Sequence, residues 1–172
     1  MYEYEFSAEI EMSGVGKERK IWYHVIFLPG RIKQQLPFEK FPRLRVEGEI
    51  ADIPIANAFL PAGDGRHYLI VAPAIRKSAQ LSVGDIADVR FTIADQNHVE
   101  IADALKQELA NDRAFAASWD ALTPGKRRMA AQHVVSARTE PTRKKRVQEA
   151  RDIVMKFSGD VRAWRGARRA AP

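Results

Sequence analysis

Two groups of cations in this sequence are spaced in a way that could hold an anion. Arg76 and Lys77 lie in the stretch AIRKSAQL, between an apolar run and the turn signal SVGD. Arg143 and Arg146 lie in TRKKRV, within a helical pattern. A guanidinium group is planar and donates parallel hydrogen bonds to a carboxylate or a phosphate. These residues therefore predict recognition of an anionic small molecule or of an acidic partner.

Helical spacing separates Arg143 from its neighbours. It precedes Val147 by four residues, so its stem lies on the apolar side of the helix, whereas Lys144 and Lys145 fall on the outer side. Two interpretations stay open for Arg143, namely a ligand clamp and a tie between this helix and the acidic surface of the N-terminal strands. Arg76 and Lys77 likewise have a plainer interpretation as solvated cations at a bend, which contribute little to stability.

Other site chemistries have weaker support. The absence of cysteine excludes disulfides, thiolate nucleophiles and cysteine-ligated metals. No phosphate-loop or dinucleotide fingerprint is present, and the carboxylates of the first strand are explained by alternation on a wet face. The histidines do not have the spacing of a metal site; they are His24, His67, His98 and His133. We therefore expect no metal and no cofactor, and an enzyme would need a site assembled only by folding, with His24 or His67 as candidates.

The first hundred residues have the pattern of short strands. MYEYEFSAEIEM alternates between apolar and acidic residues, which predicts a half-buried antiparallel strand with Phe6, Ile10 and Met12 inward. KIWYHVIFLP does not alternate and predicts a strand covered on both faces. In RLRVEGEI, Gly48 falls on the inward side, where it would allow a bend or bulge. About six such strands predict a small barrel or sandwich.

From residue 101 the period becomes helical. IADALKQELAND and RAFAASWDAL carry apolar residues three and four apart, and Thr123 followed by Pro124 predicts a helix start. A last helix is expected from near Thr139 to Gly159. The segment RAWRGARRAAP shows no apolar stripe and is expected to fray. The fold class is thus α+β, with a barrel domain at 1–97, a bundle of three to four helices at 98–160 and a flexible basic tail at 161–172.

The positive charge belongs to the C-terminal part. Residues 1–100 carry 12 Lys and Arg against 14 Asp and Glu, whereas residues 101–172 carry 16 against 8. Such a balance raises the alternative of nucleic-acid binding through the basic helices, although no aromatic platform for stacking bases is evident. Neither an export signal nor a membrane-spanning run is present, so we expect a cytoplasmic protein without membrane insertion.

Two sets of motifs carry a family resemblance. The first comprises F-x-A-x-I from Phe6, V-x-G-x-I from Val46 and I-R-K-x-A-x-L-x-V-G-D from Ile75. It resembles the bacterial family of domains of unknown function numbered 1905. The second comprises P-x-x-R-R at Pro124, Arg127 and Arg128, and A-R-x-x-x-T-R-x-x-R-V at Ala137, Arg138, Thr142, Arg143, Arg146 and Val147. It resembles the domain called bacteriocin-protection, YdeI or OmpD-associated.

The resemblance implies a closed β-barrel followed by a helical domain, and it brings no established activity. Because both specific motifs centre on cations, the predicted function is non-enzymatic binding, related to stress or bacteriocin protection. The predicted anion contacts are Arg76, Lys77, Arg138, Arg143 and Arg146.

Overall fold

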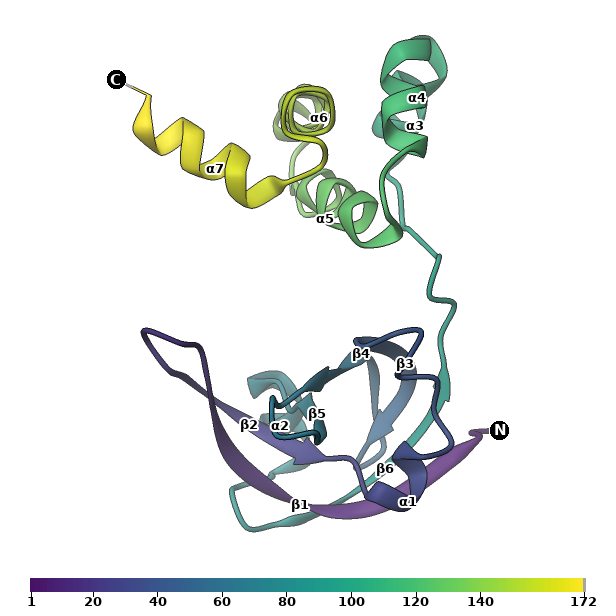
Figure 1. Ribbon diagram of the computed structural model, residues 1–172, viewed down its shortest axis with the longest axis vertical. Coiled ribbons are helices and arrows are strands. Elements are labelled where there is room, and N and C mark those ends of the chain that lie inside the picture. The colour runs from purple at the N-terminus through teal and green to yellow at the C-terminus, as the bar shows by residue number, and fades with distance from the viewer. Residues whose placement is uncertain (172) are drawn as a thin grey trace. The chain divides into compact units, whose positions relative to one another are not determined.

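The computed structural model describes residues 1–171 of the 172-residue chain (Figure 1). Contacts divide the chain after Gln96 into two compact units, and each unit is described by itself. None of the helices formed by residues 1–171 combines the length and apolar character that crossing a bilayer requires.

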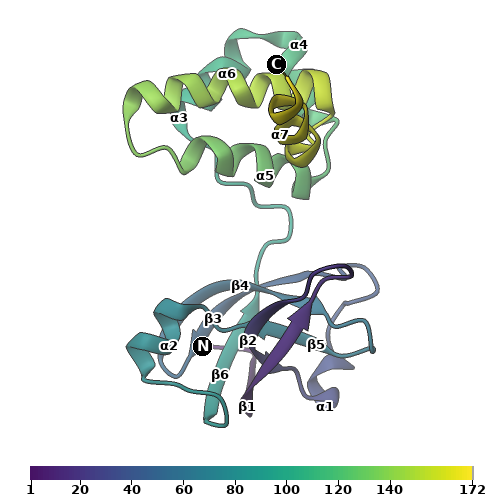
Figure 2. The ribbon, with the colours of Figure 1, turned by 90° about the vertical axis from the view of Figure 1, so that its left-hand side faces the viewer.

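The first unit is a closed antiparallel barrel, which confirms the predicted α+β class with a barrel of six strands in residues 1–96 (Figures 1 and 2). Its strands are β1 (Tyr4–Val15), β2 (Ile21–Phe27), β3 (Leu44–Ile50), β4 (Ile53–Pro61), β5 (His67–Ile70) and β6 (Ile86–Ile93). They close in the order β1-β2-β5-β4-β3-β6. Two short helices, α1 (Gly30–Lys33) and α2 (Pro73–Ala79), lie in the connections.

Alternation along β1 positions the barrel core as predicted, but only over part of the strand. Phe6 and Ile10 are buried inside the barrel. Met12 was expected on the same buried face, yet it is 43% exposed. The reason is that β1 pairs with β6 only from Tyr4 to Glu9 and continues beyond it as a hairpin with β2. The prediction of a strand covered on both faces is wrong at Trp22 for the same reason, since Trp22 in this hairpin is 59% exposed.

Gly48 lies where β3 passes unusually close to β6. The ladder is continuous, with Gly48 opposite Phe91 and Glu49 opposite Arg90, so the register contains no bulge at this residue. A Cβ on Gly48 would lie 2.0 Å from the carbonyl oxygen of Arg90. Glycine is therefore required by the close approach of a neighbouring backbone.

The second unit contains five helices in residues 97–171. They are α3 (Asp103–Asn111), α4 (Arg113–Asp120), α5 (Pro124–Val135), α6 (Glu140–Phe157) and α7 (Val161–Ala170). The α6 helix is central and packs against the other four. The predicted start at Thr123 is confirmed, since its hydroxyl accepts a hydrogen bond from the Lys126 amide. Likewise, α6 begins after the N-cap residue Thr139.

Two features make the helices more numerous than the predicted three to four. The continuous pattern from 101 to 122 is interrupted at Asp112, whose carboxylate caps α4 by accepting from the Phe115 amide at 2.9 Å.

The predicted flexible tail is the second feature. Residues 161–170 form α7, which buries Val161 and Trp164 and starts at the N-cap Asp160. The two buried residues lie three apart, which is too few to register as a stripe in the sequence. The last residue of the predicted tail, Pro172, lies outside the described residues.

Candidate functional site

The predicted anion contact Arg143 is used within the helical unit. Its guanidinium donates to the carbonyl of Ala137 at 3.1 Å and pairs with Glu140 at 3.0 Å. Both partners lie in or beside the α5–α6 connection, where the last carbonyls of α5 lack helical partners. Arg143 therefore closes the connection between α5 and α6, and its partners belong to the helical unit rather than to the strands that the alternative interpretation named.

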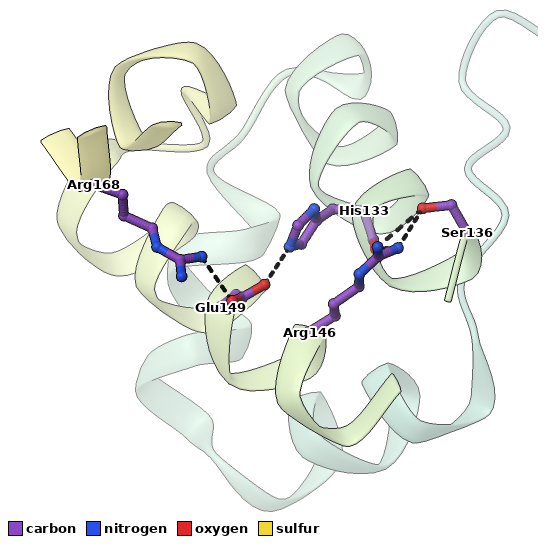
Figure 3. A network of polar contacts seen from close by, with 5 residues as sticks. All are labelled: His133, Ser136, Arg146, Glu149 and Arg168. Carbon is purple, nitrogen blue, oxygen red and sulfur yellow. Dashed lines mark hydrogen bonds and ion pairs between the residues drawn. The ribbon is translucent and has the colours of Figure 1, made fainter. Parts of the chain in front are cut away.

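Arg146 has a similar role one turn further along α6. One of its nitrogens donates to the carbonyl of His133 at 3.1 Å and to the hydroxyl of Ser136 at 2.8 Å (Figure 3). These acceptors belong to the last turn of α5 and its C-cap. A cation at the C-terminal end of a helix also interacts favourably with the helix dipole. Arg146 thus ties α6 to the end of α5.

The two arginines of the other helical motif, Arg127 and Arg128, also donate to backbone carbonyls. Arg127 donates to Leu122 at 3.0 Å and to Asp120 at 3.5 Å, both at the end of α4. Arg128 donates to the carbonyl of His98 at 3.5 Å. Arginines of both helical motifs therefore bind carbonyls in the connections around α5. These contacts explain the fixed spacing of the motif residues, and no ligand is needed to explain it.

Three helices meet in a polar network that the sequence did not suggest (Figure 3). His133 of α5 contacts Glu149 of α6 at 2.7 Å, and the other oxygen of Glu149 accepts from Arg168 of α7 at 2.8 Å. The His133 ring meets the indole of Trp164 edge to face, at 5.1 Å between centroids, and Arg168 lies over the same indole. His133, Glu149 and Arg168 lie on three different helices and belong to no sequence motif. Nothing in the local sequence therefore indicated that they meet.

The environment of Glu149 shows how the network holds α7. Burial by itself would raise the pKa of this carboxyl, but the hydrogen bond to His133 and the charges of His133 and Arg168 outweigh it and hold the pKa below its usual value. The charged form of Glu149 is therefore the one that the fold stabilises, and it links α5, α6 and α7.

A histidine hydrogen-bonded to a carboxylate is also part of catalytic triads, but within residues 1–171 no hydroxyl group is hydrogen-bonded to the His133 ring. The side chains of His133 and Glu149 are only 12% and 17% exposed. The nearest hydroxyl in the network, that of Ser136, donates to the backbone carbonyl of His133 and accepts from Arg146, not from the imidazole. A nucleophile must lie within hydrogen-bond reach of its base. This arrangement serves as a clamp between helices.

Arg76 and Lys77 lie on the short helix α2. Lys77 is exposed, whereas Arg76 is partly buried. The Nε atom of Arg76 is buried, and across residues 1–171 its side chain has neither a hydrogen bond nor an ion pair. Leaving a buried donor unsatisfied costs about 1–3 kcal/mol, more for a charged group. Among the five predicted anion contacts, Arg76 is the one whose donor is both buried and without a partner.

Arg138 is exposed in the connection between α5 and α6. Its side chain is not hydrogen-bonded or ion-paired to any part of the chain that the structure describes. It differs in this respect from Arg143 and Arg146 nearby. The helical motif thus leaves one of its three predicted contacts available.

The histidines do not gather. In the described chain, no three His, Asp or Glu side chains lie close enough to hold a metal ion. His67 is the unusual one, since it is 8% exposed, stacks on Phe38 at 3.8 Å, and has an Nδ1 atom without a partner among residues 1–171. Burial lowers its pKa, the charge of Lys33 lowers it further, and a hydrogen bond with the Pro42 backbone opposes them. It is a buried histidine at the start of β5 that packs against the segment following α1.

The closed barrel and the helical unit define a two-part α+β protein. Residues 6–91 match the family described as domain of unknown function (DUF1905), and residues 98–155 match the family described as bacteriocin-protection, YdeI or OmpD-associated. The chain belongs to the DUF1905 family and carries a bacteriocin-protection domain after it, which confirms both resemblances. A search among curated proteins gave no match.

Proposed function

We propose that this chain is a non-enzymatic, protection-associated protein that binds an anionic small molecule or an acidic partner at Arg76 on the barrel. The observation that carries the proposal is the unsatisfied guanidinium of Arg76, with its buried Nε. A carboxylate or phosphate would accept in parallel from the two terminal nitrogens of this guanidinium, which are not buried and form no hydrogen bond within residues 1–171. Lys77, the next residue, adds a second positive charge at the same helix.

The state of the other predicted contacts supports this choice of site. Arg143 and Arg146 already donate to carbonyls at the end of α5, so an anion would compete with bonds that hold the helical unit together. Arg138 has no side-chain partner within residues 1–171 but is exposed, and a single exposed ion pair contributes little. A partly buried guanidinium gains more from an anion because water screens the pair less.

The test is a thermal-shift comparison with defined probes, namely inorganic phosphate, citrate and adenosine monophosphate. A probe at 100 times its dissociation constant stabilises the native state by about 2.7 kcal/mol. We expect at least one probe to raise the Tm of the wild type and to have no effect on Arg76→Gln. Arg19→Gln, which removes the same charge from an exposed position of the same unit, is the control and should keep the shift.

Three results would reject the proposal. One is the absence of any shift with all probes in the wild type. Another is a shift that persists in Arg76→Gln. An equal loss in Arg76→Gln and Arg19→Gln would also contradict it, because the effect would then follow net charge and not the site.

A further inference from the structure

The helix α7 divides its side chains into an anchoring side and a cationic side. Val161 and Trp164 are buried in the helical unit, whereas Arg162, Arg165 and Arg169 are exposed. Spacings of three and four residues place these three arginines on one side of the helix. Their side chains form no hydrogen bond or ion pair with any of residues 1–171. Segment 161–171 also contains no acidic residue.

This arrangement opposes the stability of the helix. Like charges three or four residues apart destabilise a helix by about 0.2–0.5 kcal/mol per pair. Arg162 also lies in the first turn, at the positive end of the helix dipole. Neighbouring carboxylates or neutral side chains would remove both costs. The retained cost indicates that the cations serve something other than the fold of α7.

The rest of the unit holds α7 firmly in spite of this repulsion. Asp160 accepts hydrogen bonds from the amides of Arg162 and Ala163 at 2.9 and 3.0 Å. Trp164 is only 5% exposed. Arg168, the fourth arginine of the helix, is turned to Glu149 (Figure 3). It also lies over the Trp164 ring. The other three arginines are therefore presented on an ordered scaffold, which lowers the entropy cost of binding.

The family comparison and the charge of the unit add to the argument. The match to the bacteriocin-protection family ends at residue 155, so α7 lies beyond it. Residues 97–172 carry 16 Lys and Arg against 9 Asp and Glu, a net charge of +7. The α7 arginines thus belong to a strongly positive unit, and nothing in the family description accounts for them.

We propose that the face formed by Arg162, Arg165 and Arg169 binds the phosphate backbone of a nucleic acid. The three residues span about 10 Å along the helix, or about three base-pair steps of a duplex strand. Arginine is suited to phosphate because its fork donates two hydrogen bonds to one group. A membrane surface fits less well, since an interfacial helix inserts an apolar face and that face of α7 is buried in the unit. The site is separate from Arg76 and does not depend on it.

The experiment is a salt titration of binding by the full chain to a fluorescently labelled DNA duplex, followed by anisotropy. Three phosphate contacts predict a slope of about −2.7 in a plot of log K against log salt. The triple variant Arg162→Gln, Arg165→Gln, Arg169→Gln should bind at least about 10-fold more weakly and lose most of that slope. The control, Arg113→Gln, Lys144→Gln, Lys145→Gln, removes equal charge from exposed positions of the same unit and should keep most of the slope.

Folding of the α7 variant can be checked separately, because Trp164 and Arg168 are left in place. Its helical circular dichroism and Tm should equal or exceed those of the wild type, since repulsion is relieved. An equal loss of affinity in both triple variants would overturn the proposal, since binding would then follow net charge alone. Binding that is insensitive to salt would overturn it too. Tighter binding to polyglutamate or to phosphatidylserine vesicles than to DNA would assign the face to an acidic protein or to a membrane instead.

Discussion

Replacement of Gly48 by alanine tests the barrel most directly. The new Cβ would lie 2.0 Å from the carbonyl oxygen of Arg90 and 2.7 Å from the Cα of Phe91. Because real Cβ atoms do not approach closer than 3.0 Å, β3 and β6 would have to separate by about 1 Å. The Phe91 ring packs against Phe6 and Phe59 in the core, so β6 has no free space to move into.

The expected cost follows from two opposing contributions. Overpacking of a tight core costs about 1–3 kcal/mol, and a clash with backbone atoms falls at the upper end. Loss of glycine freedom in the unfolded chain returns about 0.4–1 kcal/mol. The net destabilisation of about 2–3 kcal/mol should lower the Tm of the barrel by about 10–20 °C.

The assay is differential scanning calorimetry of the full chain, with hydrogen exchange of β3 and β6 to assign the barrel transition. Gly30→Ala is a matched control in the same unit, because no atom lies within 4 Å of its added Cβ and its φ is not positive. It should be neutral or raise the Tm slightly. A Gly48→Ala barrel that melts within about 3 °C of the wild type would show that the close approach is not a constraint.

Three further outcomes are expected. First, the barrel should lose stability as the pH falls below 6.5, the ordinary pKa of histidine, because the pKa of His67 is lowered in the fold and its protonation there is costly. In urea titrations, His67→Phe should make the stability of the barrel less dependent on pH. Second, the pKa of Glu149 is lowered in the fold, so this residue contributes stability at pH values above 4.5, its ordinary pKa, and this stability is lost as the pH falls through the folded pKa. In hydrogen exchange of α7, Glu149→Gln should remove this sensitivity to acid. Trp164→Ala removes about 3–5 kcal/mol of packing, so trypsin should cleave within α7 at least about 100-fold faster. Unchanged pH profiles in the first two variants, or an unchanged cleavage rate in the third, would contradict these expectations.

Much of the fold followed from local patterns. Alternation along β1 predicted the inward positions of Phe6 and Ile10 because a strand has a side-chain period of two. Thr123 predicted the start of α5 because its hydroxyl satisfies an amide that the helix leaves free. These signals depend on near neighbours in the chain and so survive without knowledge of the fold.

Predictions failed where burial depends on which strands or helices come together. Met12 continues the alternation of β1, but the pairing between β1 and β6 ends at Glu9. Met12 therefore stays exposed although it is apolar. The helix α7 looked like a polar tail because it has few large apolar residues, and what holds it is burial of Val161 and Trp164 against the rest of the unit, with Arg168 meeting Glu149 on α6.

The sequence by itself determined that this chain has a strand-rich half, a basic helical half and clusters of arginine in both. Only the tertiary structure decided which arginines remain available. Arg143 and Arg146 are used on the carbonyls that end α5, whereas Arg76 and the exposed face of α7 have no partner in residues 1–171. The physical reason is that a guanidinium takes its acceptors from whatever backbone or carboxylate the fold brings within reach, and sequence spacing does not encode that distance.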